Sequence, residues 1–176
     1  MSTGVESDDV TVSGRAFDEV YAAHVGSTLA VVLALRGVQV GAEDIVQEAF
    51  TRAFERWREV GLMDRPDLWV HRVALNLATS RLRRLASEQR ALARLFECRE
   101  EPRSVAFERE QHFWELVRRL PPRQAHVVAL RYAGELSVRE IAEVVGVAEG
   151  TVKAQLHTAR IRLELLLSTC DGEGRG

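Results

Sequence analysis

The sequence is poor in cysteine. Its 176 residues include only two, Cys98 and Cys170, which lie far apart in the chain. Neither has a metal-ligand spacing to the other cysteine or to a histidine. A disulfide-stapled fold and a structural zinc site are therefore not expected, and we predict two reduced thiols in a cytoplasmic protein.

Long hydrophobic runs are also missing. The longest, Leu29–Leu35, is much shorter than the roughly 20 apolar residues of a membrane-spanning helix. The N-terminus is acidic and has no apolar segment of the kind found in secretory signal peptides. These absences predict a protein without membrane insertion.

No catalytic constellation can be assembled from the sequence. The five histidines are scattered over separate segments, and no zinc-protease, phosphate-loop, nucleophile-elbow or deaminase motif is present. We therefore expect no enzymatic activity, no metal and no cofactor. An enzyme with an unfamiliar motif is an alternative that this absence leaves open.

The chain has almost no excess of either charge, because its formal net charge is −2. The distribution is nevertheless uneven. Residues 1–19 hold five acidic side chains against one arginine, whereas residues 65–94 hold seven arginines against two acidic side chains. A basic block of this kind is typical of a surface that meets phosphates.

Apolar residues follow helical spacing through most of the chain, and no useful stretch alternates like a strand. The pattern predicts an all-α fold with two small helical domains joined by a flexible linker. In the first half we expect helices at Phe17 onward, about Thr28–Arg36, Ala42–Trp57 and about Pro66–Leu85, with a loop at Glu59–Arg65. The expected divisions are a disordered tail at 1–13, domains at 14–85 and 111–167, a linker at 86–110 and a tail at 168–176.

The segment Leu136–Leu163 has the pattern of a helix-turn-helix. Ser137 and Glu140 have the spacing of a capping box, and Gly146 stands where the first helix must stop. The buried stripe expected on the second helix consists of Val152, Leu156, Ala159 and Leu163. The opposite face is small and polar, which suits the major groove, and it holds Gly150, Lys153, Ala154 and His157. A helical hairpin that only packs in an all-α core is the alternative.

The predicted helix at Pro66–Leu85 carries residues suited to single-stranded DNA. Trp69 can stack on a base, Asn76 can read a base edge, and the arginines that follow can bind phosphates. The alternative is that Trp69 belongs to the core and that the arginines form a solvated flank. The helix at Ala42–Trp57 has a broad apolar stripe that consists of Ile45, Val46, Ala49, Phe50, Ala53, Phe54 and Trp57. Its remaining polar residues have the pattern of an ordinary solvated face.

Two blocks of this chain, in this order, resemble the extracytoplasmic-function (ECF, group IV) sigma factors of bacterial RNA polymerase. AEDIVQEAF at Ala42–Phe50 and DLWVHRVALNLATSRLRR at Asp67–Arg84 resemble sigma region 2. LPPRQAHVVALRYAGELSVREIAEVVGVAEGTVKAQLHTARIRL at Leu120–Leu163 resembles sigma region 4. Three positions depart from the family's usual residues, namely Ser80 for Asp, Ala148 for the Ser that caps the recognition helix, and Gln155 for Arg.

The resemblance implies roles for three groups of residues. The first would bind the clamp helices of the polymerase β′ subunit and consists of Asp44, Gln47, Glu48 and Thr51. The second would bind the −10 element, with the loop Glu59–Arg65 and Asn76 holding a flipped base, and consists of Asp64, Arg65, Trp69, Arg72, Asn76, Ser80, Arg83 and Arg84. The third would read the −35 element and consists of Glu149, Gly150, Thr151, Lys153, Ala154, His157 and Arg160.

The predicted function is therefore that of a sigma factor without catalytic activity. It would bind core polymerase through the β′ clamp helices and the β flap, read −35 DNA as duplex and −10 DNA as single strand, and be regulated by an anti-sigma factor. One alternative is a regulator with a LuxR-type helix-turn-helix that binds duplex DNA without polymerase. Another is a helical interaction protein that never touches DNA.

Overall fold

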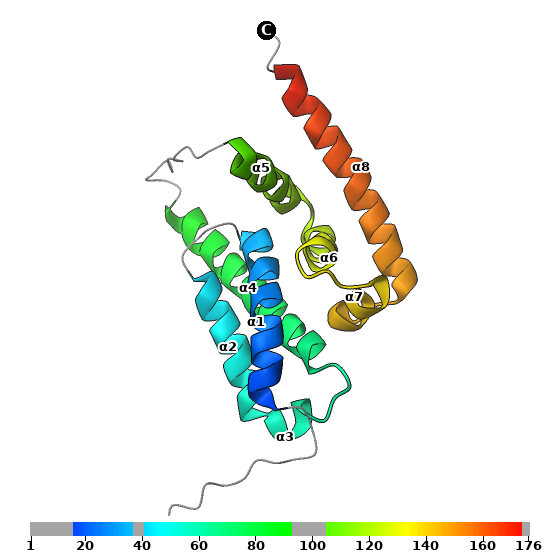
Figure 1. The fold of residues 1–176 in the computed structure, drawn as a ribbon. Helices are drawn as coiled ribbons and strands as arrows, with labels where there is room; N and C mark the ends of the chain where they lie inside the picture. Colours follow the sequence, from blue (N-terminus) through cyan, green and yellow to red (C-terminus); the bar gives the residue numbers. More distant parts are fainter. Residues whose placement is uncertain (1–15, 37–40, 93–104, 174–176) are drawn as a thin grey trace, which may run out of the picture.

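The computed structural model describes residues 16–36, 41–92 and 105–173, and over these ranges the chain is entirely helical apart from turns (Figure 1). This confirms the all-α expectation. The tail expected at 1–13 lies outside the described residues. The helices are α1 Phe17–Arg36, α2 Ala42–Glu55, α3 Trp57–Val60, α4 Pro66–Leu92, α5 Val105–Arg119, α6 Pro122–Tyr132, α7 Val138–Val145 and α8 Glu149–Glu173.

Helix α1 is one continuous helix, so the expectation of two helices before Gly37 was wrong. Gly26 does not interrupt it, and the hydroxyls of Ser27 and Thr28 donate to the carbonyl of His24, at 3.1 and 2.8 Å. These groups are thus satisfied within the helix rather than used as caps. By length and composition alone α1 could cross a membrane, but it packs against α2, α4, α5 and α6, as a core helix does.

Helices α1, α2 and α4 enclose one apolar core. Ile45, Ala49 and Ala53 of α2 are completely buried in it, which confirms the stripe predicted for this helix. Phe54 departs from the prediction, because 63% of its surface is exposed. It lies at the end of α2, where its ring contacts Phe17 at a centroid distance of 5.1 Å.

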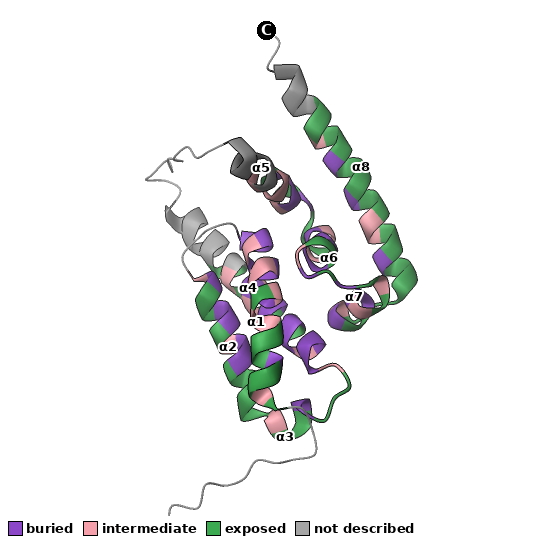
Figure 2. Cartoon of the chain, viewed as in Figure 1, coloured by how far each residue is buried: buried purple, intermediate pink, exposed green. Residues whose placement is uncertain are grey.

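Helices α5 to α8 build a second core, and this core also takes in residues of α1 and α4. Val31 of α1 and Leu68 and Leu75 of α4 belong to the same buried cluster as Ile141 and Val152. Figure 2 shows buried residues on the helices of both halves. Because one buried cluster includes residues of both, the two halves of the chain share apolar packing.

The loop between α6 and α7 approaches α1 very closely. A Cβ on Gly134 would lie 2.9 Å from Val31 Cγ2 and 2.9 Å from the carbonyl oxygen of Leu130. Only glycine fits here without a shift of its neighbours.

Several helices are longer than the sequence pattern predicts. Helix α4 continues to Leu92 rather than ending near Leu85, α5 begins at Val105 rather than near Gln111, and α8 continues to Glu173. The extension of α4 runs through Ala, Glu, Gln and Arg, all good helix formers. The loop expected from Glu59 is also shorter, because α3 includes Glu59 and Val60.

Candidate nucleic-acid and polymerase interfaces

The helix-turn-helix has the geometry that its sequence predicts. The Ser137 side chain accepts from the backbone N–H of Glu140, and the Glu140 carboxylate accepts from the backbone N–H of Ser137, at 3.3 and 2.7 Å. Gly146 ends α7 in the left-handed conformation with φ 74°. The capping box and the glycine stop are therefore confirmed.

Helix α8 turns one stripe inward and one face outward. Val152 and Ala159 are completely buried, Leu163 is 9% exposed, and Leu156 is half-buried, which confirms the predicted stripe. All residues expected to read the −35 element are exposed, namely Glu149, Gly150, Thr151, Lys153, Ala154, His157 and Arg160. Lys153 is also the only lysine in the chain.

The first turn of α8 lacks a side-chain cap. The backbone carbonyl of Ala148 accepts from the N–H groups of Thr151 and Val152, at 2.9 and 3.2 Å, so Ala148 occupies the N-cap position. Its methyl group cannot accept a further hydrogen bond, as a serine hydroxyl would. Further along the exposed face, Arg160 pairs with Glu164 at 2.9 Å. Such an exposed pair contributes little to stability, so Arg160 can exchange Glu164 for a phosphate.

Helix α4 and the loop before it hold the residues expected to bind the −10 element. Asp64, Arg72, Asn76, Ser80, Arg83 and Arg84 are exposed. Trp69 is only partly exposed and packs against the core of α1, α2 and α4, so much of its ring is not free to stack on a base.

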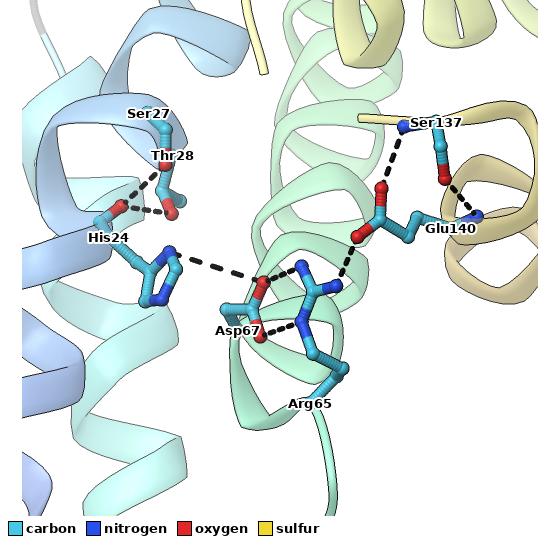
Figure 3. Close-up of polar contacts among 7 residues, drawn as sticks. All are labelled: His24, Ser27, Thr28, Arg65, Asp67, Ser137 and Glu140. Atoms are coloured by element: carbon cyan, nitrogen blue, oxygen red, sulfur yellow. Dashed lines mark hydrogen bonds and ion pairs between the residues drawn. The ribbon is translucent and has the colours of Figure 1, made fainter. Parts of the chain in front are cut away.

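Arg65 is held by two carboxylates (Figure 3). Its guanidinium donates twice to Asp67, at 2.9 and 2.7 Å, and also to Glu140 on α7. Asp67 is almost completely buried. Burial alone would raise the pKa of Asp67, but the hydrogen bonds and charge of Arg65 lower it below its usual value.

Glu140 connects this cluster to the helix-turn-helix. Its hydrogen bonds with Ser137, followed by the one from Arg65, lower the pKa of Glu140 to about 2. Arg72 of α4 donates to two backbone carbonyls of α7. These are the carbonyl of Val144, at 3.1 Å, and that of Glu143. Two arginines of the proposed −10 set thus contact α7.

A cleft of about 950 Å³ lies beside these contacts. Its polar wall comes from α4, α6 and α8 and consists of Arg72, Asn76, Thr79, Arg83, Arg123, Gln124, His126, Gln155 and Arg162. No carboxylate is among the described residues that line it, so the cleft is positively charged. Burial, followed by the charge of Arg83, lowers the pKa of His126, whose Nε2 lies 3.3 Å from Thr79 Oγ1.

The expected polymerase-binding residues share one face of α2. Asp44, Gln47 and Thr51 are exposed, and Glu48 is partly exposed and accepts from Arg52 at 2.8 Å. Asp44 lies 4.0 Å from Arg81 of α4. Their spacing of three or four residues places them together on the helix surface.

Sequence reasoning missed the polar residues that are buried. His71 is a polar residue of α4, but it is 1% exposed, and its Nδ1 has no hydrogen-bond partner among the residues that the structure describes. Asp67 was not singled out, although its position two residues after Arg65 was a local signal for the ion pair. In the described ranges no group of three His, Cys, Asp or Glu residues could hold a metal ion.

Each half of the chain matches a known protein family. Residues 20–88 match the family described as Sigma-70 region 2, and residues 111–163 match Sigma-70, region 4. The two matches, in this order, define a sigma factor of the sigma-70 class.

Curated relatives cover most of the chain. The RNA polymerase sigma-E factor of Streptomyces antibioticus is 31% identical over 136 residues, covering 77% of this chain and 76% of that protein. The ECF RNA polymerase sigma factor SigW of Bacillus subtilis is 30% identical over 133 residues, covering 68% and 71%. The chain therefore belongs to the ECF family of sigma-70 factors: it is a soluble, non-enzymatic RNA polymerase sigma factor that directs transcription initiation.

Solved structures share the fold. The sigma factor RpoE in complex with the anti-sigma factor NepR, from Bartonella quintana, has a TM-score of 0.72 at 22% identity, covering 86% of this chain and 96% of that one. CnrH in complex with the cytosolic domain of CnrY has a TM-score of 0.62 at 21% identity, covering 87% and 88%.

Proposed function

We propose that this sigma factor divides promoter recognition between α8 and α4. The exposed face of α8 reads the −35 element in the major groove, and α4 with the loop before it binds the −10 element as an unwound single strand. The observation that carries the proposal is the division of α8 into two faces. One face is buried in the core, and the opposite face, which holds the expected −35 residues, is exposed. A helix anchored in this way can present its outer face to DNA.

The proposal assigns the α2 face around Asp44, Gln47 and Thr51 to the β′ clamp helices, and region 4 also touches the β flap. Because the total charge is near zero, the free chain makes few phosphate contacts and polymerase supplies the tether. The protein works in the cytoplasm. An anti-sigma factor regulates it, as the likeness to two sigma factors solved with anti-sigma factors supports.

The LuxR-type alternative does not account for the match of residues 20–88 to sigma region 2. A protein of that class would bind duplex DNA on its own. The match to sigma region 2 therefore favours promoter recognition that depends on polymerase over binding of duplex DNA by the free chain.

The test is transcription in vitro with core polymerase, the purified chain and a promoter library. We expect initiation from a subset of promoters that share −35 and −10 elements. Lys153→Ala should weaken initiation from the selected promoters, whereas Arg58→Ala, which removes an exposed cation outside α8, should not. The proposal fails if the chain supports initiation from no promoter. If both variants support the same level of transcription, the exposed face of α8 does not read the −35 element.

A further inference from the structure

The cleft between α4, α6 and α8 holds more positive charge than the promoter contacts use. Its volume of about 950 Å³ lies in the range of small-molecule sites. Its described lining includes four arginines and no carboxylate, and a concave wall of one charge sign concentrates the electric field inside it. The arginines are Arg72, Arg83, Arg123 and Arg162. The proposed promoter contacts account for Arg72 and Arg83 but not for the other two.

Three of these arginines, from three helices, surround the first turn of α6. Arg123 belongs to that turn, and Arg162 of α8 donates to Gln124 Oε1 at 3.0 Å. Arg83 of α4 lies close enough to His126 for its charge, after burial, to lower the pKa of that histidine. Because His126 and Arg123 are three residues apart on α6, they lie on the same face of the helix. One end of the cleft therefore carries three guanidinium groups.

The N-terminus of α6 adds to this positive charge. Pro121 at the N-cap supplies no side-chain cap, and the first turn contains no acidic residue. The backbone N–H groups of Gln124 and Ala125 donate to the carbonyl of Pro121, whereas that of Arg123 has no partner within the described part of the chain. Helix N-termini favour anions, and guanidinium groups bind phosphate through paired hydrogen bonds. This end of the cleft thus has the chemistry of a phosphate site.

The other end of the cleft carries two amides and an apolar wall. Asn76 lies seven residues before Arg83 on α4, and Gln155 lies seven residues before Arg162 on α8. Each amide is therefore two turns, or about 10 Å, from its arginine. Arg72, the cation nearest this end, already donates to carbonyls of α7. The apolar wall consists of Leu75, Val144 and Val145. An amide can read the edge of a base, and aliphatic side chains can pack on its face.

We propose that the cleft is a binding site for a nucleotide that carries two or more phosphates, such as a nucleoside triphosphate. The phosphates bind Arg83, Arg123 and Arg162 at the first turn of α6, and the base lies between Asn76 and Gln155. Binding by the free chain does not require promoter recognition. Its consequence does rest on the proposed function: Asn76 and Arg83 belong to the proposed −10 set, so the nucleotide competes with the −10 strand for both.

Isothermal titration calorimetry on the full chain tests the site with ATP, GTP and tripolyphosphate. The buffer contains no divalent cation, because Mg²⁺ would neutralise the phosphates that the arginines bind. The cleft variant combines Arg123→Gln with Arg162→Gln, two exposed side chains outside the proposed promoter sets. The matched control combines Arg58→Gln with Arg119→Gln, which removes two exposed cations outside the cleft. Circular dichroism verifies folding, and Arg123→Gln alone serves as the variant if the double substitution does not fold.

We expect at least one of the two nucleotides to bind roughly tenfold more tightly than tripolyphosphate, the effect of one good base contact. The cleft variant should weaken that binding by roughly tenfold or more, since charge-assisted hydrogen bonds are lost. The control should change it by less than about twofold, because distant exposed charges are screened. The proposal is overturned if neither nucleotide binds, if tripolyphosphate binds as tightly as both, or if the control weakens binding as much as the cleft variant.

The position of the base can be measured separately, because Asn76 is the only asparagine in the chain. Labelling asparagine with ¹⁵N gives one side-chain amide signal in an NMR spectrum. The nucleotide that binds should shift this signal, and tripolyphosphate should not. An equal shift with tripolyphosphate, or no shift with the nucleotide, would contradict the proposed site. Neither polymerase nor promoter takes part in these measurements, so a failure of the proposed function would appear separately, as a chain that cannot initiate transcription.

Discussion

His71 affects stability, because it is a buried histidine whose Nδ1 has no partner within the described part of the chain. Burial lowers the pKa of His71 to about 4, below the ordinary value of about 6.5. The unfolded chain therefore binds a proton at this position between about pH 6.5 and 4 while the folded chain does not. Folding stability should fall as the pH is lowered through that interval.

We expect His71 to contribute a loss of about 3 kcal/mol between pH 7 and pH 4, since each pKa unit corresponds to about 1.4 kcal/mol. The measurement is urea unfolding of the parent and of His71→Leu at several pH values. The variant should lose most of this slope and keep the contribution of His126, whose pKa is also lowered by burial. Equal slopes in both proteins would show that His71 is already protonated or is not buried.

Asn76 supports a prediction about DNA opening. Its amide is exposed in the cleft beside Arg72 and Arg83, and the proposed −10 role gives it an unstacked base to hold. Asn76→Ala should therefore reduce open-complex formation by about tenfold, the effect of one bidentate base contact, and affect initial promoter binding much less. Stopped-flow fluorescence of promoter binding and opening separates the two steps, and an equal loss at both would argue against the flipped-base role.

At the scale of elements, α8 begins without a side-chain cap. Ala148→Ser should supply the missing acceptor for a first-turn N–H and stabilise the protein by about 1 kcal/mol. Chemical denaturation measures this directly, with Ala154→Ser as a control for placing the same side chain at an exposed position inside the helix. If Ala148→Ser is no more stable than the control, Ala148 is not the N-cap.

The helix-turn-helix was predictable because its determinants are local. The capping box spans four residues, and the buried stripe of Val152, Ala159 and Leu163 follows helical spacing, so neither depends on the rest of the chain. Helix ends were less predictable. Gly26, Ser27 and Thr28 favour an interruption in sequence, but packing on both sides of α1 keeps the helix continuous.

At the scale of the whole molecule, the sequence predicts two helical units but not their contact. Arg65 and Glu140 are separated by 75 residues, and no periodicity or motif pairs them. The same holds for the buried state of His71, because a polar residue among apolar neighbours does not reveal that a second helix covers it. Residues could thus be assigned to the −10 and −35 faces, whereas the hydrogen bonds of Arg65 and Arg72 to α7 required the structure.

In the proposed function, −35 DNA is read as duplex and −10 DNA as single strand, and both only with polymerase. The most direct test combines DNase I and permanganate footprinting on one promoter selected from the library. With core polymerase, the chain should protect the −35 element and make thymines at −10 reactive; alone, at the same concentration, it should do neither. Protection of −35 duplex by the free chain with polymerase-like affinity, or polymerase-dependent protection without reactive thymines at −10, would contradict the account.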